Sequence, residues 1–259
     1  MATLSHMDRD RAEKFHPELA IDNFSAIDCD LSFYSFVRSI YSRQIIKDVL
    51  DYGAGRNQYV QEFDPSRDSY LIRDLRDLRY KEAKVTAADV SQAVLTHPTS
   101  DRQIVFDPNI PLPFGDASFD LIVSDFVVEH VLDPKIVAHE LQRVLRPSGW
   151  IAIRTPNKYG YLRLAASAIQ NAMHNKVLKH VQPNRKQEDT FPTYYRLNSL
   201  KDVKAHFSDC QVYSFIDSWE PAYFFGNAWL YRLFLILHKI LPRKFGTASV
   251  FIMQKRQTG

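Results

Sequence analysis

The segment VLDYGAGRNQYV, residues 49–60, joins an apolar run to Asp51 and then to two glycines one residue apart, Gly53 and Gly55. Glycine lets a chain turn tightly and lets its backbone approach a ligand, because no Cβ stands in the way. Glycines also occur in strand-to-helix turns for packing alone. The two glycines therefore indicate only that a ligand could bind here. The side chains around the turn determine which ligand it is.

Three further aspartates follow apolar runs: Asp89 ends KVTAAD, Asp107 ends RQIVFD, and Asp125 stands near the end of FDLIVSD. Open α/β sheets bind ligands at the carboxyl ends of their strands. A carboxylate after the second strand can accept both hydroxyl protons of a ribose, and one after the third can accept from the amino group of an adenine. Each aspartate alone could equally cap a helix or close a turn. Three at successive strand ends favour an adenosine site.

A dinucleotide site is the competing interpretation of the glycine turn. Its GxGxxG pattern requires a third glycine where Gln58 stands, and it expects an acid about 20 residues farther on. The nearest acid that ends a strand-like run, Asp89, lies 34 residues after Gly55. Dinucleotide binding, and with it an NAD-dependent enzyme, is disfavoured.

Apolar runs of strand length alternate with runs of helical period, which predicts an α/β fold with a parallel sheet covered on both faces. Asp133 and Pro134 have the types expected at the start of a helix, and His139 falls opposite that helix's apolar stripe. The arginines and aspartates of residues 73–81 are interpreted as a solvated helix face. Predicted strands span residues 47–52, 83–90, 102–107, 118–126, 149–156, 210–223 and 248–256, and predicted helices span 31–46 and 133–149.

The predicted organisation is a helical N-terminal extension, residues 1–44, and one main domain, residues 45–259. Within that domain, residues 157–205 form a longer connection than a plain crossover needs, which predicts a lid or acceptor-site insertion. Residues 227–243 are apolar nearly all round. We expect this segment to be a core or lid helix between the last two strands, lining an apolar acceptor pocket. Peripheral contact with a membrane surface is the less favoured alternative.

Composition excludes several classes of protein. The chain has 259 residues, a formal net charge of +3 and two cysteines. So small a charge does not indicate a nucleic-acid partner, and the cysteines form neither a disulfide framework nor a metal site, so no metal is expected. The apolar run at residues 229–241 is interrupted by charge and is too short to span a membrane. We expect a cytoplasmic protein.

Four motifs in order resemble the class I S-adenosylmethionine-dependent methyltransferases, in their type 11-like branch with small-molecule acceptors. They are VLDYGAGRN, AADVS, IPLPFGDASFDLIVSDFVVEHVLDP and ELQRVLRPSGWIAIRTPN. The resemblance implies a Rossmann-like, doubly wound, mostly parallel seven-stranded sheet whose last strand is antiparallel, with helical lid or cap additions. It also implies that S-adenosylmethionine is the cofactor and S-adenosylhomocysteine the product. The cofactor-binding residues implied are Asp51, Gly53, Ala54 and Gly55 at the methionine end, Asp89 and Val90 at the ribose, Asp107 near the adenine, and Ser124 and Asp125 around the methyl group.

The chain departs from the family pattern at a few positions. Asn57 replaces the third glycine of the first motif, and Ser148 replaces one glycine of the pair before the fifth strand. Asn57 tolerates left-handed backbone better than most residues, so the turn can survive. The loop from Asp107 to Leu112 is one residue longer than usual, which bears on the adenine contact.

The acceptor site is the least defined part. His130, after the fourth strand, is the candidate base, and a wall or capping role is the alternative. His180, Tyr194, Tyr195 and Arg196 are candidates for the substrate pocket. Methylation of a small-molecule or glycan-like acceptor at oxygen is the predicted function. A catalytically silent methyltransferase-like binding or scaffold protein is the alternative from another class.

Overall fold

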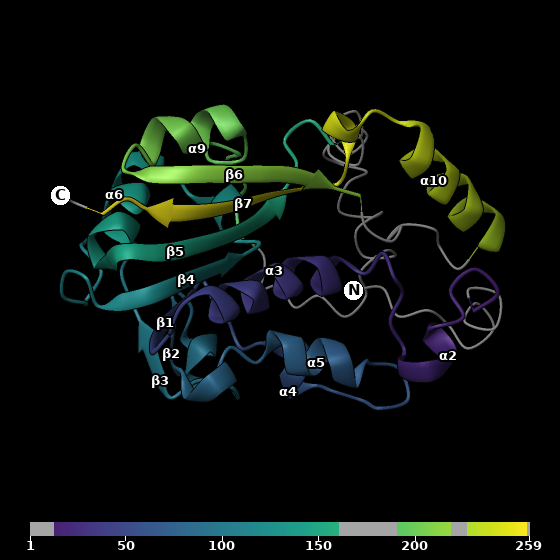
Figure 1. Ribbon diagram of the computed structural model, residues 1–259, viewed down its shortest axis with the longest axis horizontal. Helices are drawn as coiled ribbons and strands as arrows, with labels where there is room; N and C mark the ends of the chain where they lie inside the picture. The colour runs from purple at the N-terminus through teal and green to yellow at the C-terminus, as the bar shows by residue number, and fades with distance from the viewer. Residues whose placement is uncertain (1–12, 161–190, 219–226, 258–259) are drawn as a thin grey trace.

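The computed structural model describes residues 13–160, 191–218 and 227–257, which contain one seven-stranded sheet of order β3-β2-β1-β4-β5-β7-β6 (Figure 1). Strands β1, β2, β3, β4 and β5 are mutually parallel, and β7 runs antiparallel to both of its neighbours, β5 and β6. The predicted Rossmann-like sheet with an antiparallel last strand is confirmed. The strands are β1 (Asp48–Tyr52), β2 (Lys84–Asp89), β3 (Arg102–Val105), β4 (Phe119–Asp125), β5 (Leu145–Pro156), β6 (Cys210–Asp217) and β7 (Ala248–Lys255).

Helices cover both faces of the sheet, and successive residues of a strand contribute to opposite cores. Val49 of β1 packs in the core beneath α3 (Cys29–Arg43) and α5 (Tyr70–Arg76), whereas Leu50 packs in the core beneath α6 (Pro134–Val144) and α9 (Leu200–His206). Strands buried on both faces explain the nearly continuous apolar runs in the sequence. Helix α3, within the predicted extension 1–44, packs directly on the sheet through Phe33, Val37 and Ile40.

Side-chain caps begin the two longest helices that cover the sheet. Asp133 accepts from the backbone N–H groups of Lys135 and Ile136 at 3.0 and 3.3 Å, and Asp28 caps α3 in the same way. Such caps satisfy N–H groups that have no partner inside the helix. The imidazole of His139 on α6 is 75 % exposed, as its position opposite the apolar stripe predicted.

Further helices and 3-10 turns complete the described chain. They are α2 (Leu19–Asp22), α4 (Gln58–Gln61), α10 (Ala228–Ile240) and the 3-10 turns η1 (Tyr80–Glu82), η2 (Gln92–Thr96), η3 (Val128–His130) and η5 (Arg243–Phe245). None of the helices in the described ranges has the length and apolar character needed to cross a bilayer.

Some predicted boundaries and environments were wrong. Strand β3 ends at Val105, so Asp107 lies in the following loop. Helix α6 ends at Val144, because the chain passes directly into β5 at Leu145. The interpretation of residues 73–81 as a solvated face fails at Arg76, whose side chain is 19 % exposed and pairs with Asp30.

The predicted insertion 157–205 is described only at its two ends. Beyond residue 190, Leu197 and Val203 are fully buried in the core that α6 and α9 cover. His180 lies outside the described residues.

Candidate active site

The β1–α4 turn is held against the end of β2 by backbone hydrogen bonds. The N–H of Gly53 donates to the carbonyl of Ala88 at 2.7 Å, and the N–H of Ala54 donates to the same oxygen at 3.2 Å. The N–H of Gly55 then donates to Asp89 Oδ2 at 2.9 Å, while Ser91 N–H donates to Asp89 Oδ1 at 2.7 Å. Asp89 therefore ties together the two loops that any ligand at this edge would contact.

The two glycines of the turn are required for different reasons. Both have left-handed backbone, with φ of +75° at Gly53 and +53° at Gly55. A Cβ at Gly53 would lie 2.3 Å from a methyl of Val127, whereas a Cβ at Gly55 would meet no atom within 4 Å. Gly53 serves close packing, and Gly55 faces open space. Asn57 adopts a φ of 46°, so the third position keeps left-handed backbone without glycine.

Asp51 and His97 form a buried pair beneath this turn. His97 Nε2 lies 3.6 Å from Asp51 Oδ2, and neither ring nitrogen has a hydrogen-bond partner within the described part of the chain. Burial, and then the nearby charges of Asp125 and Asp89, raise the pKa of Asp51 to about 7. Burial, and then repulsion by Arg76, lower the pKa of His97 to about 4. Near pH 7 the histidine is neutral and the carboxyl is half protonated.

Arg154 organises a second buried cluster at the ends of β4 and β5. Its guanidinium binds both oxygens of Asp125 at 2.6 Å and also contacts Asp30 Oδ1 of α3 at 2.6 Å. Arg76 of α5 completes the cluster with a 2.9 Å contact to the other oxygen of Asp30. Burial alone would raise the pKa of Asp30, but Arg76 and Arg154 outweigh it and hold the pKa well below its usual range.

This cluster accounts for Asp125, which the resemblance placed near the methyl group. Its Oδ2 also accepts from the Tyr34 hydroxyl at 3.1 Å, so the carboxylate is largely engaged by protein groups. The neighbouring Ser124 is fully buried, and its hydroxyl has no hydrogen-bond partner within the described residues. Sequence reasoning missed Arg154 and His97. The signal for Arg154 was a single arginine inside the apolar run WIAIRTP.

His130 lies on η3 with one ring nitrogen already engaged. Nδ1 is 2.8 Å from the backbone carbonyl of Pro192, and a carbonyl can only accept. Nδ1 must therefore carry the proton of the neutral ring, which leaves Nε2 unprotonated. The ring of Phe191 meets the imidazole edge to face at 5.9 Å. In the neutral ring Nε2 is thus the acceptor nitrogen, and it lies 3.9 Å from Glu129 Oε1.

The segment that supplies Pro192 also carries three of the predicted acceptor-site residues. The N–H groups of Tyr194 and Tyr195 donate to the carbonyl of Glu129 at 2.7 and 3.2 Å, and Arg196 donates to the carbonyl of Leu132 at 2.8 Å. Tyr194 is 40 % exposed, so its ring remains accessible beside η3. These residues are therefore brought close to His130.

Asp107 lies apart from this arrangement. It is exposed, and its Oδ1 accepts from the backbone and side-chain nitrogens of Asn109, both at 2.8 Å, as in an ordinary loop turn. Val90, directly after Asp89, is 41 % exposed and presents an apolar surface at the sheet edge. The adenine contact of Asp107 stays a prediction.

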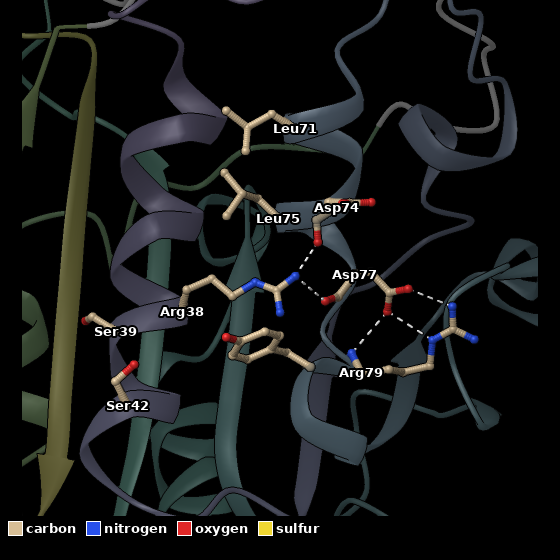
Figure 2. Close-up of a pocket in the computed structure, with 9 residues that line it drawn as sticks. Arg38, Ser39, Ser42, Leu71, Asp74, Leu75, Asp77 and Arg79 are labelled. Atoms are coloured by element: carbon tan, nitrogen blue, oxygen red, sulfur yellow. Dashed lines mark hydrogen bonds and ion pairs between the residues drawn. The ribbon is translucent and has the colours of Figure 1, made fainter. Parts of the chain in front are cut away.

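A surface groove of about 560 Å³ lies between α3 and α5, away from these residues (Figure 2). Arg38 crosses it, donates to the carbonyls of Asp74 and Asp77, and stacks its guanidinium 4.2 Å from the centre of the Tyr80 ring. None of the predicted cofactor-binding residues lines this groove.

Residues 50–153, from β1 into β5, match the family model of a methyltransferase domain. By this match, residues 50–153 form a methyltransferase domain, and they resemble the class I S-adenosylmethionine-dependent methyltransferases. A probable S-adenosylmethionine-dependent methyltransferase of Mycobacterium tuberculosis is 37 % identical over 78 residues, which are 29 % of this chain and 28 % of that protein. The chain thus aligns with little more than a quarter of that relative.

Two further proteins resemble the domain. A malonyl-[acyl-carrier protein] O-methyltransferase of Coxiella burnetii is 33 % identical over 90 residues, 35 % of this chain and 31 % of that one. The structure of a methyltransferase of Thermotoga maritima, described as a possible histamine N-methyltransferase, superposes with a TM-score of 0.51 at 12 % identity and covers 97 % of this chain and 99 % of its own. The latter supports the fold alone.

The curated relatives that this domain resembles depend on S-adenosylmethionine. The carboxyl edge of the sheet fits it, because Gly55 opens onto free space and the buried Ser124 hydroxyl has no partner within the described chain. Asp89 holds its carboxylate where two loops meet, with acceptor lone pairs left for a ribose. Asp51 and the turn from Gly53 to Gly55 would hold the methionine end.

Proposed function

We propose that this chain transfers a methyl group from S-adenosylmethionine to oxygen of a small-molecule or glycan-like acceptor. The observation that carries the proposal is the hydrogen bond between His130 Nδ1 and the Pro192 carbonyl, which makes Nε2 the acceptor nitrogen of the neutral ring. A hydroxyl acceptor of high pKa needs a positioned base, whereas an amine may need only orientation. An oriented imidazole therefore supports an oxygen acceptor.

In this proposal the protein mainly aligns groups. S-adenosylmethionine, when bound, supplies an electrophilic methyl group on a sulfonium and leaves as a neutral thioether. Asp51, Gly55 and Asp89 hold the cofactor, and His130 Nε2 takes the proton that the acceptor hydroxyl loses. Alignment of two reactants accounts for a large share of such rate enhancement, and a positioned base adds about 10²–10⁴-fold.

The acceptor is proposed to bind beside His130, against the segment 191–196. The exposed Tyr194 ring lies 5.7 Å from the Arg196 guanidinium, so an aromatic surface and a cation are neighbours there. Such a pair suits a polar, hydroxylated molecule, because the ring contacts its carbon skeleton and the cation its oxygens. In a silent scaffold the same hydrogen bond would only hold the segment 191–196 against η3, so turnover distinguishes the two functions.

The test compares His130→Gln with His139→Gln, a matched change at an exposed histidine on α6. Transfer of a radiolabelled methyl group is measured against a panel of phenols, sugars and hydroxy acids. We expect His130→Gln to lower turnover by about 10²-fold or more, with S-adenosylhomocysteine affinity unchanged. His139→Gln should behave as wild type. Equal turnover in both variants would contradict the role of His130, and transfer to amines alone would contradict the oxygen acceptor.

A further inference from the structure

Helix α10 exposes one continuous apolar face. Trp229, Leu233, Ile236 and Ile240 are 77, 51, 54 and 69 % exposed. They are spaced by four, three and four residues, so they form a single stripe along the 13-residue helix. A soluble domain rarely exposes so many large apolar side chains side by side, and such a patch usually marks an interaction surface.

The opposite side of α10 attaches the helix to the protein. Tyr231 is 2 % exposed, and its ring lies 6.3 Å from that of Phe15 and 6.2 Å from that of His16. Asn227 caps the first turn, with its side chain accepting from the N–H groups of Trp229 and Leu230 at 2.9 and 3.2 Å. The helix is therefore anchored through its inner side, and its exposed stripe is available to a partner.

Basic residues border the apolar stripe. Arg232 and Lys239 are exposed along one flank, and Arg243 and Lys244 are exposed just beyond the end of the helix. The sequence from Asn227 to Gly246 contains no aspartate or glutamate. The Arg232 guanidinium lies 5.0 Å from the Phe15 ring and 5.8 Å from the Trp229 ring, so a cation borders the apolar stripe at Trp229. Long basic side chains can cover apolar surface while their charges reach toward a polar boundary.

We propose that α10 docks on an anionic membrane surface, with its apolar stripe in the acyl boundary and its basic flank at the headgroups. An apolar face with tryptophan and a cationic flank is the pattern of helices that lie in the interface. A helix of 13 residues is too short to span a bilayer. A second copy of the chain would bring like charges together without acids to neutralise them, so charge complementarity favours lipid.

The helix lies beyond the carboxyl ends of the parallel strands, toward which their arrows point in Figure 1. Docking through α10 would bring that edge of the sheet close to the bilayer, where a lipid-linked acceptor would be presented. This consequence for the acceptor rests on the proposed methyl transfer. Docking itself does not, and it can be measured without cofactor.

The test uses the full chain and vesicles of phosphatidylcholine with or without about a third of phosphatidylglycerol. We expect the protein to cosediment with the anionic vesicles and to partition at least ~10-fold more weakly onto neutral ones. Each basic residue near an anionic surface increases the partition coefficient about 5-fold. Trp229 emission should shift to shorter wavelength on binding, and Trp229→Phe should remove that shift. Binding should weaken at high salt, which screens the headgroup charge.

Two double variants distinguish docking through α10 from nonspecific adsorption of the protein to vesicles. Leu233→Glu with Ile236→Glu should abolish vesicle binding while leaving S-adenosylhomocysteine binding intact. Ile45→Glu with Ile136→Glu alters residues that are 81 and 48 % exposed elsewhere on the surface and should bind vesicles as wild type does. The proposal is overturned if anionic vesicles bind no protein, or if both pairs bind alike. It is also overturned if light scattering shows a lipid-free dimer that only the α10 pair dissociates.

Discussion

Replacing Asp51 with asparagine should stabilise the cofactor-free protein at pH 8 while weakening its affinity for S-adenosylhomocysteine. Burial of the Asp51 carboxyl group beneath the glycine turn, and then the nearby charges of Asp125 and Asp89, raise its pKa from 3.8 to about 7. Above that pH the folded protein must hold an ionised group in an unfavourable place. Asparagine has nearly the same shape and carries no charge, so it relieves this cost but cannot attract a cofactor's ammonium group.

The magnitude follows from the shift in pKa. A rise of about three pKa units, at ~1.4 kcal/mol each, limits the stability that Asp51→Asn can gain to about 4 kcal/mol. The Asp51 side chain keeps 17 % exposure, so water screens part of this effect. We expect a gain of about 1–3 kcal/mol in the free energy of unfolding at pH 8.

The sign of the pH dependence is specific. The pKa of Asp51 is higher in the folded state than in the unfolded state. Ionisation of Asp51 therefore lowers the free energy of unfolding of the wild-type protein as pH rises from about 4 to about 7. The advantage of Asp51→Asn should therefore be small near pH 4 and grow by about 1–2 kcal/mol between pH 5 and pH 8. Urea unfolding of both proteins at the two pH values measures it, with Asp209→Asn as an exposed control. If Asp51→Asn is less stable than wild type at pH 8, or if the stability difference between the two proteins does not change with pH, Asp51 does not have a raised pKa.

Two further substitutions test the packing around the site. Arg154→Met should destabilise the protein by about 3–5 kcal/mol in urea unfolding, because it leaves Asp125 and Asp30 buried without their shared cation; a loss below about 1 kcal/mol, the value of a surface pair, would mean that the cluster is not desolvated. Gly53→Ala should cost about 1–3 kcal/mol more than Gly55→Ala, because only the former drives a Cβ into a neighbouring side chain. Thermal unfolding compares the two, and equal losses would contradict the packing role of Gly53.

The sheet and its ligand-binding edge could be predicted from the sequence because their signals are local. Apolar runs of strand length alternate with helical periods, and Asp51, Gly53 and Gly55 stand within five residues of one another. Asp89 could be placed beside them because the ends of parallel strands meet at one edge. The structure brings Asp89 Oδ2 within 2.9 Å of the Gly55 nitrogen.

The buried ion cluster could not be predicted, because its members come from distant parts of the chain. Asp30 and Arg154 are 124 residues apart, and they meet only once α3 packs on the sheet. Local spacing likewise made Arg76 resemble a member of a solvated helix face, whereas tertiary packing buries it against Asp30. The pattern of α10 indicated an apolar helix, but only the structure distinguishes its attached side from its exposed one.

Binding of S-adenosylhomocysteine, measured by calorimetry, tests the central claim most directly. We expect wild-type protein to bind it with a dissociation constant in the micromolar range and not to bind NAD. Asp89→Ala should weaken binding by about 10–100-fold, as the loss of hydrogen bonds to a charged group predicts. Asp209→Ala, an exposed change outside the site, should bind as wild type does. Heat from NAD alone, or equal affinity in the Asp89 and Asp209 variants, would contradict the placement of the cofactor at this edge of the sheet.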